Sequence, residues 1–183
     1  MRRLWAAAAA MVVCLALGGL PALAQDETEA VGGNAWYVGT ATCPEVVSPG
    51  TATLENGVQQ VRDAVLDCMS ATDAPRLNGP YTLHHNYDCY LLTTPTPGYS
   101  GCVMWGTSVS PEPYGWTATY TGVEDASGQQ TVQVIGVGFG ANAGWVFYEV
   151  DTLSAASGTN DVEGLLYQGA PPPAVPLPSP ASE

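Results

Sequence analysis

Lysine is absent from this chain, and its four arginines stand against 17 acidic residues, which gives a formal net charge of −13. A surface of this sign repels phosphate backbones and anionic lipid headgroups. We therefore expect no binding to nucleic acid or to a membrane surface. We interpret the acidity as a source of solubility outside the cell.

The signatures of common catalytic and cofactor sites are missing as well. The chain contains no G-x-S-x-G elbow, P-loop, EF-hand, HExxH or dinucleotide fingerprint. Its cysteines and histidines do not occur at the short spacings of metal sites, and its acidic residues form no recognisable glycosidase pair. We assign no catalytic residue, and we expect neither a metal ion nor a cofactor.

The first 24 residues have the three parts of an export signal. Arg2 and Arg3 precede an apolar run over residues 4–20, Pro21 breaks that run, and small residues end the segment at Ala24. The run is short for a membrane span, and no stop-transfer charges follow it. We predict cleavage between Ala24 and Gln25, a secreted or periplasmic/cell-envelope location, and no membrane attachment after cleavage.

The remaining chain, roughly 160 residues, has the length of one domain. Residues 25–33 are predicted to be an acidic, flexible N-terminus, and residues 34–169 the folded domain. Residues 170–183 are rich in proline, which fixes φ and lacks an N–H group, so we predict a disordered, extended tail.

The folded region predicts strands rather than helices. Trp116, Ala118 and Tyr120 alternate with three threonines, which is the period of a half-buried strand. Asn56-Gly57 is a strong hairpin signal. A helix over residues 58–71 is the one rival, and its β-branched residues favour a strand. The predicted strands are residues 35–42, 51–55, 58–68, 81–88, 102–109, 116–121, 131–138, 145–152 and 162–167.

Eight or nine consecutive short strands indicate an all-β fold, either a small antiparallel barrel or a β-sandwich. Glycines inside the strand patterns favour the barrel, since glycine marks bends and close approaches of the backbone. These glycines are Gly39, Gly106, Gly136, Gly138 and Gly164.

Four cysteines remain after the predicted cleavage, and an even number in an exported chain indicates two disulfides. If strand direction reverses twice between Cys43 and Cys68, both lie at the same end of the sheet. Cys89 and Cys102 flank the loop over residues 92–101. We therefore pair Cys43 with Cys68 and Cys89 with Cys102, although four cysteines allow three pairings.

The run Gly136-Val137-Gly138-Phe139-Gly140, followed by Gly144-Trp145 and by a strand with Val162-Glu163-Gly164, resembles the glycine-rich strand–turn–strand of allene oxide cyclase and dirigent-type barrels. The resemblance covers residues 115–169. It implies an eight-stranded antiparallel barrel with an apolar cavity. It carries over no catalytic residue, because no matching motif is present.

Aromatic and cationic residues are the candidates for ligand binding. Inward-pointing aromatics would either fill the core or line a pocket for an apolar or saccharide ligand. An arginine at the barrel mouth could clamp an anion or a carbonyl, although each arginine is expected to pair with a carboxylate, and Glu149, Asp151 and Glu163 lie in predicted strands. His84 shares a strand face with Asp88, but an ordinary strand histidine is favoured over a general base or metal ligand. The candidates are Trp105, Trp116, Trp145, Tyr120, Arg62, Arg76 and His84.

Three functions fit these features. A non-catalytic binding module is favoured, with a small apolar or saccharide ligand or a surface partner. A cofactor-free cyclase or isomerase and a purely structural extracellular protein are the alternatives. A cavity of several hundred Å³ with Arg62, Arg76 or His84 in its wall would favour binding or catalysis. The sequence does not determine the oligomeric state.

Overall fold

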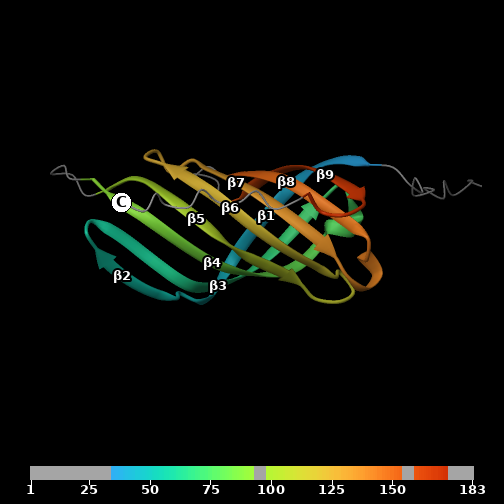
Figure 1. The fold of residues 1–183 in the computed structure, drawn as a ribbon, viewed down its shortest axis with the longest axis horizontal. Coiled ribbons are helices and arrows are strands. Elements are labelled where there is room, and N and C mark those ends of the chain that lie inside the picture. Colours follow the sequence, from blue (N-terminus) through green and yellow to red (C-terminus); the bar gives the residue numbers. More distant parts are fainter. Residues whose placement is uncertain (1–33, 93–97, 154–158, 173–183) are drawn as a thin grey trace, which may run out of the picture. The chain divides into compact units, whose positions relative to one another are not determined.

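The computed structural model describes residues 34–92, 98–153 and 159–172 (Figure 1). The predicted signal peptide, its cleavage position, the acidic N-terminus and residues 173–183 of the tail lie outside this part of the chain. The described residues form strands and two single-turn 3₁₀ helices, η1 (Pro75–Leu77) and η2 (Gly140–Asn142). The strands are β1 (Ala35–Ser48), β2 (Thr51–Glu55), β3 (Val58–Thr72), β4 (Gly79–Leu91), β5 (Tyr99–Ser110), β6 (Trp116–Asp125), β7 (Gln130–Gly138), β8 (Trp145–Leu153) and β9 (Asn160–Gln168).

The strands form a closed antiparallel barrel of eight strands with one strand added. Consecutive strands from β3 to β9 pair in order, and β1 pairs with both β9 and β3, which closes the ring. The ninth strand, β2, pairs only with β3 and extends beyond the barrel wall, at the left of Figure 1. The all-β barrel is therefore confirmed, and the β-sandwich is not formed.

Period-two alternation separates the barrel interior from its outer surface. In β6, Trp116, Ala118 and Tyr120 are buried, whereas the threonines between them are exposed. Apolar residues from opposite walls meet in a single core, which includes Tyr37 and Leu166 on one side and Met104 and Trp116 on the other. The tryptophans are divided between the two surfaces: Trp116 is 4% exposed and Trp36 is 64% exposed. Closure of the barrel therefore buries Trp116 and leaves Trp36 on the outer surface.

Residues 58–71, for which a helix was the alternative, belong to the long strand β3, as predicted. Asn56 and Gly57 both adopt positive φ, 50° and 78°, and connect β2 to β3 by a two-residue turn. Such a turn matches the right-handed twist of paired strands. The hairpin therefore fixes the extended conformation at the start of β3.

Both disulfides join the cysteines that were paired from the sequence, Cys43 with Cys68 and Cys89 with Cys102. The argument for the first pair was wrong in one respect. Strand direction reverses once between Cys43 and Cys68, not twice, because β1 and β2 both run antiparallel to β3. Cys43 therefore meets Cys68 directly across the β1–β3 pair that closes the barrel.

No helix in the described part of the chain is long and apolar enough to span a membrane.

Candidate functional site

The barrel interior contains a cavity of about 120 Å³. Part of its wall is apolar and aromatic, with Met104, Trp116, Val134 and Phe147 from β5 to β8. A cavity of about 150 Å³ in another protein is large enough for benzene. The space inside this barrel therefore suits a molecule of about six heavy atoms.

Two acidic residues place carboxyl groups in the cavity wall. Glu149 and Asp151 are two residues apart on β8, so both side chains point inward, and both line the cavity. The Tyr37 hydroxyl donates a hydrogen bond of 2.7 Å to Oε2 of Glu149. Asp151 is only 7% exposed, and its Oδ1 atom is buried with no hydrogen-bond partner in the described part of the chain.

Burial makes both acids much weaker than usual. Desolvation raises the pKa of Glu149 to about 7, and the hydrogen bond from Tyr37 opposes this shift. Desolvation, with a smaller contribution from the negative charge of Glu149, raises the pKa of Asp151 to about 8. A carboxyl group in a poorly hydrated site holds its proton because the ionised form loses its water. The pair therefore titrates near neutral pH.

The other titratable side chains around the pair are tyrosines. Burial raises the pKa of Tyr37 and of Tyr81, and the charges of Glu149 and Asp151 raise both further. Burial also raises the pKa of Tyr120. These three side chains stay neutral at physiological pH and present hydroxyl groups to the interior.

His85 is the interior histidine, and it also lines the cavity. Its Nδ1 atom hydrogen-bonds with the Tyr120 hydroxyl at 2.6 Å, and the two rings stack with centroids 6.0 Å apart. Burial lowers its pKa, which favours the neutral imidazole. The wall thus contains acids and neutral groups, and no lysine or arginine lines it in the described ranges.

One end of the barrel is covered by the loop that contains η1. Leu77 of this loop lines the cavity, and the indole N–H of Trp116 donates a 2.8 Å hydrogen bond to the Arg76 carbonyl. The Arg76 guanidinium donates to Oδ1 of Asn142 at 3.2 Å and lies 4.9 Å from the Trp145 ring centre. Arg76 and Trp145 therefore hold the end loops together, and the carboxylate partner expected for Arg76 stays a prediction.

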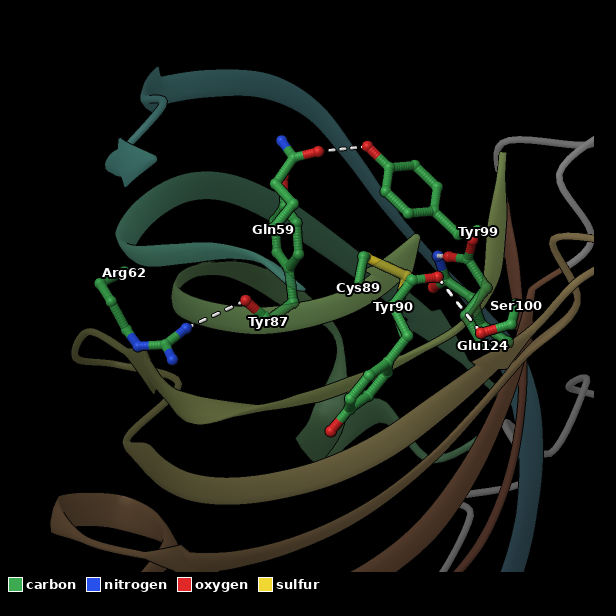
Figure 2. Close-up of a disulfide and its surroundings, with 10 residues drawn as sticks. Gln59, Arg62, Tyr87, Cys89, Tyr90, Tyr99, Ser100 and Glu124 are labelled. Carbon is green, nitrogen blue, oxygen red and sulfur yellow. Dashed lines mark hydrogen bonds between the residues drawn. A yellow bond between two sulfur atoms is a disulfide. The ribbon is translucent and has the colours of Figure 1, made fainter. Parts of the chain in front are cut away.

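Arg62 lies on the outer face of the barrel, away from the cavity. It contacts Oδ1 of Asp88 at 2.6 Å and lies 4.8 Å from the Trp105 ring centre. Figure 2 shows its guanidinium donating to the Tyr87 carbonyl. The expected carboxylate partner of Arg62 is confirmed. This cluster fastens β3 to β4 and β5.

The sequence-predicted ligand residues do not form one site. Trp116 and Tyr120 line the cavity, but Trp105 and Arg62 pack on the outer face and Arg76 and Trp145 lie at the covered end. His84 is exposed, and Asp88, its suggested partner, pairs with Arg62 instead. None of Arg62, Arg76 and His84 is among the described residues that line the cavity, and their role as ligand residues stays a prediction.

Sequence reasoning missed the site roles of His85, Tyr81 and Tyr37, and it left Glu149 and Asp151 as acids in need of an arginine. Tyr37 takes the place of that arginine beside Glu149. The available signal was the i, i+2 spacing of the two acids on one strand, beside the inward Phe147. No sequence rule identified that face of β8 as the inner one.

Within the residues that the structure describes, no three histidine, cysteine or acidic side chains lie close enough together to hold a metal ion. Comparison of the chain with family models, with curated proteins and with solved structures finds no match in any of the three. The resemblance of residues 115–169 to allene oxide cyclase and dirigent-type barrels stays a prediction.

Proposed function

We propose that this protein is an exported, non-catalytic binding module that holds one small ligand inside its barrel. The observation that carries the proposal is the interior cavity, whose wall combines aromatic side chains with buried acidic, hydroxyl and imidazole groups. Ligand sites are typically apolar spaces with a few convergent polar groups. The two disulfides support export, because such bonds persist in oxidising compartments.

The cavity volume limits the ligand. About 120 Å³ is below the roughly 300 Å³ at which pockets for drug-sized molecules begin. Of the two ligand types predicted from the sequence, a small, mostly apolar molecule fits the interior better than a saccharide does. A single five- or six-membered ring with one polar substituent matches both the size and the wall.

The test is a titration of the oxidised, signal-free protein with cyclopentanol and with benzene, followed by ¹H–¹⁵N NMR. We expect saturable shifts confined to residues around the cavity, such as Trp116 and Val134. Ala41 lines the cavity at 4% exposure, so Ala41→Leu should fill the space and abolish the shifts. Ala52→Leu on the exposed strand β2 is the matched control and should leave them unchanged.

Absence of saturable shifts with either compound in the folded wild-type protein would contradict the binding function. Mass spectrometry of the exported protein tests the compartment separately. The expected N-terminus is at or next to Gln25, and full-length chain in the exported fraction would contradict export.

The elevated pKa of Glu149 favours a second candidate, the cofactor-free isomerase. An acid that titrates near 7 can take up and return a proton at neutral pH. Cyclopentanone has six heavy atoms, the size that the cavity suits. In D₂O, an isomerase-like site would exchange the α-hydrogens of this ketone for deuterium faster than buffer does. Exchange that depends on Glu149 would favour catalysis, and exchange at the buffer rate would favour the binding module.

A further inference from the structure

Among the described residues, no lysine or arginine lines the cavity that holds the two acids. The charged or titratable groups around Glu149 and Asp151 are Tyr37 from β1, Tyr81 from β4 and Tyr120 from β6. His85 from β4 also lines the cavity and is held by Tyr120. The walls from β7 and β9 add no ionisable group to the cavity lining.

One acceptor atom is buried and unused. Oδ1 of Asp151 has no hydrogen-bond partner among the residues that the structure describes, although Asp151 is only 7% exposed. Leaving such an atom unpaired costs stability, so buried polar atoms without a partner call for an explanation. Asp151 is one of the residues that line the cavity, so its carboxyl group lies next to the space that a bound molecule would fill.

From this arrangement we propose that Glu149 and Asp151 bind the ammonium group of a small organic amine. The inference rests on the proposed binding function and names its ligand class. The ammonium would donate to the free Oδ1 of Asp151 and to the carboxylate of Glu149. Its hydrocarbon part would lie against Trp116 and Phe147, and aromatic faces attract cations.

The volume and the charge balance support an amine over other ligands. An alkylamine with a five-membered ring has six heavy atoms, which fits about 120 Å³. A carboxylate ligand would add a negative charge beside two acids. A neutral alcohol could donate only one hydrogen bond, and at a pH high enough to ionise the acids it would leave their charge without a counter-charge.

Proton linkage gives the inference a distinctive signature. Below about pH 7 both acids hold protons, so an ammonium group must displace a proton to bind. Binding should therefore strengthen as the pH rises from 5.5 to 8. It should weaken again near pH 10, where an alkylamine loses its own proton. The affinity for a neutral alcohol should follow neither change.

The experiment compares cyclopentylamine with cyclopentanol, which have the same ring and differ in the polar group. Calorimetric titration of the wild-type protein at pH 8 should show the amine at least about tenfold tighter than the alcohol. At pH 5.5 the preference should fall to less than about threefold. Titrations at pH 6.5 in buffers of different ionisation enthalpy should show that the protein releases protons when the amine binds.

Glu149→Gln and Asp151→Asn keep the side-chain shapes and remove the charges. Each variant should lose most of the preference for cyclopentylamine over cyclopentanol, measured as the ratio of the two affinities in the same variant. Glu163→Gln is the matched control, since it removes an equal charge from the exposed face of β9. It should behave like the wild type.

The outcomes separate the two proposals. If cyclopentanol binds and the amine binds no tighter at pH 8, the amine site is wrong and the binding function stands. An amine preference that survives both acid substitutions would also overturn it. Failure of both compounds to bind the folded wild-type protein would contradict the binding function itself.

Discussion

At the scale of single residues, Gly164 determines the position of Tyr37, the hydrogen-bond donor to Glu149. A Cβ atom at this position would lie 2.5 Å from the Tyr37 ring and 2.6 Å from the Tyr148 carbonyl oxygen. The missing side chain thus leaves room for Tyr37, whose hydroxyl donates to Glu149. Gly164 of β9 therefore helps to shape the interior site, although it has no side chain.

Gly164→Ala should destabilise the protein by about 1–3 kcal/mol, the usual cost of overpacking a filled core. Urea unfolding at pH 6 measures the change. Gly98→Ala is the control, because a Cβ there would meet only the end of the Leu92 side chain at 3.4 Å. Equal unfolding midpoints for Gly164→Ala and the wild type would show that Tyr37 is not confined by this glycine.

The acid pair makes stability depend on pH. The pKa of Asp151 is about 8 in the folded state and about 4 in an unfolded chain, so the folded state binds the additional proton between these values. This contribution is fully present below pH 4 and is lost as the pH rises through 8. The sign is therefore destabilisation by alkali.

We expect Asp151→Asn to lose less stability than the wild type between pH 5 and pH 9, by an amount on the order of 4 kcal/mol. Urea unfolding at the two pH values provides the comparison, with Glu163→Gln as a charge-matched control on the outer surface. Parallel losses for Asp151→Asn and the wild type would mean that Asp151 titrates normally.

Adjacent residues illustrate which part of the site could be predicted from the sequence. Period-two alternation implies that His84 and His85 face opposite sides, but it does not say which one faces inward. The sequence pattern made His84 the candidate ligand residue of the two, and the structure places His85 beside Tyr120. The choice depends on how β4 registers against β3 and β5, and those pairings are long-range properties of the closed barrel.

At the scale of elements, β2 differs from every strand of the ring. All five of its residues are exposed, and it pairs only with β3. Few buried contacts and one paired edge are the features of segments that open locally. The register of β2 against β3 therefore depends mainly on the Asn56-Gly57 turn that connects them.

Gly57→Ala tests the turn alone. A Cβ atom at Gly57 would have no atom within 4 Å, so the substitution is disfavoured only by the positive φ of 78°. The substitution should cost about 1 kcal/mol locally. Hydrogen exchange followed by mass spectrometry should show faster exchange in β2 and an unchanged rate in β6. An equal acceleration in both strands would mean that β2 and the barrel open as one unit.

The strand β1 shows where reasoning from local patterns stops. Its alternation predicted the strand over residues 35–42, but β1 continues to Ser48, past Pro44. The register of β1 against β3 shifts between Thr42 and Glu45, and an irregularity of this kind accommodates a proline. The chain then passes into β2 without reversing, because β3 is long enough to pair with both strands in turn.

At the scale of the whole molecule, the two disulfides stabilise different parts of the barrel. Cys89–Cys102 joins β4 to β5, which are neighbours in sequence and pair along their length. Cys43–Cys68 joins β1 to β3, the pairing that closes the ring. The second bridge also closes a longer loop, with a sequence separation of 25 residues against 13.

Loop-closure entropy alone predicts that losing Cys43–Cys68 costs about 3.5 kcal/mol and losing Cys89–Cys102 about 3 kcal/mol. We expect the measured gap to be larger, because without the first bridge β1 can separate from β3 while the β4–β5 hairpin stays paired on its own. Thermal unfolding of Cys43→Ala/Cys68→Ala and of Cys89→Ala/Cys102→Ala tests this order. The first variant should also lose ligand binding at temperatures where the second retains it, since Ala41 and Cys43 of β1 line the cavity. Equal stabilities would show that the closing pair is held by its backbone hydrogen bonds and does not depend on the covalent link.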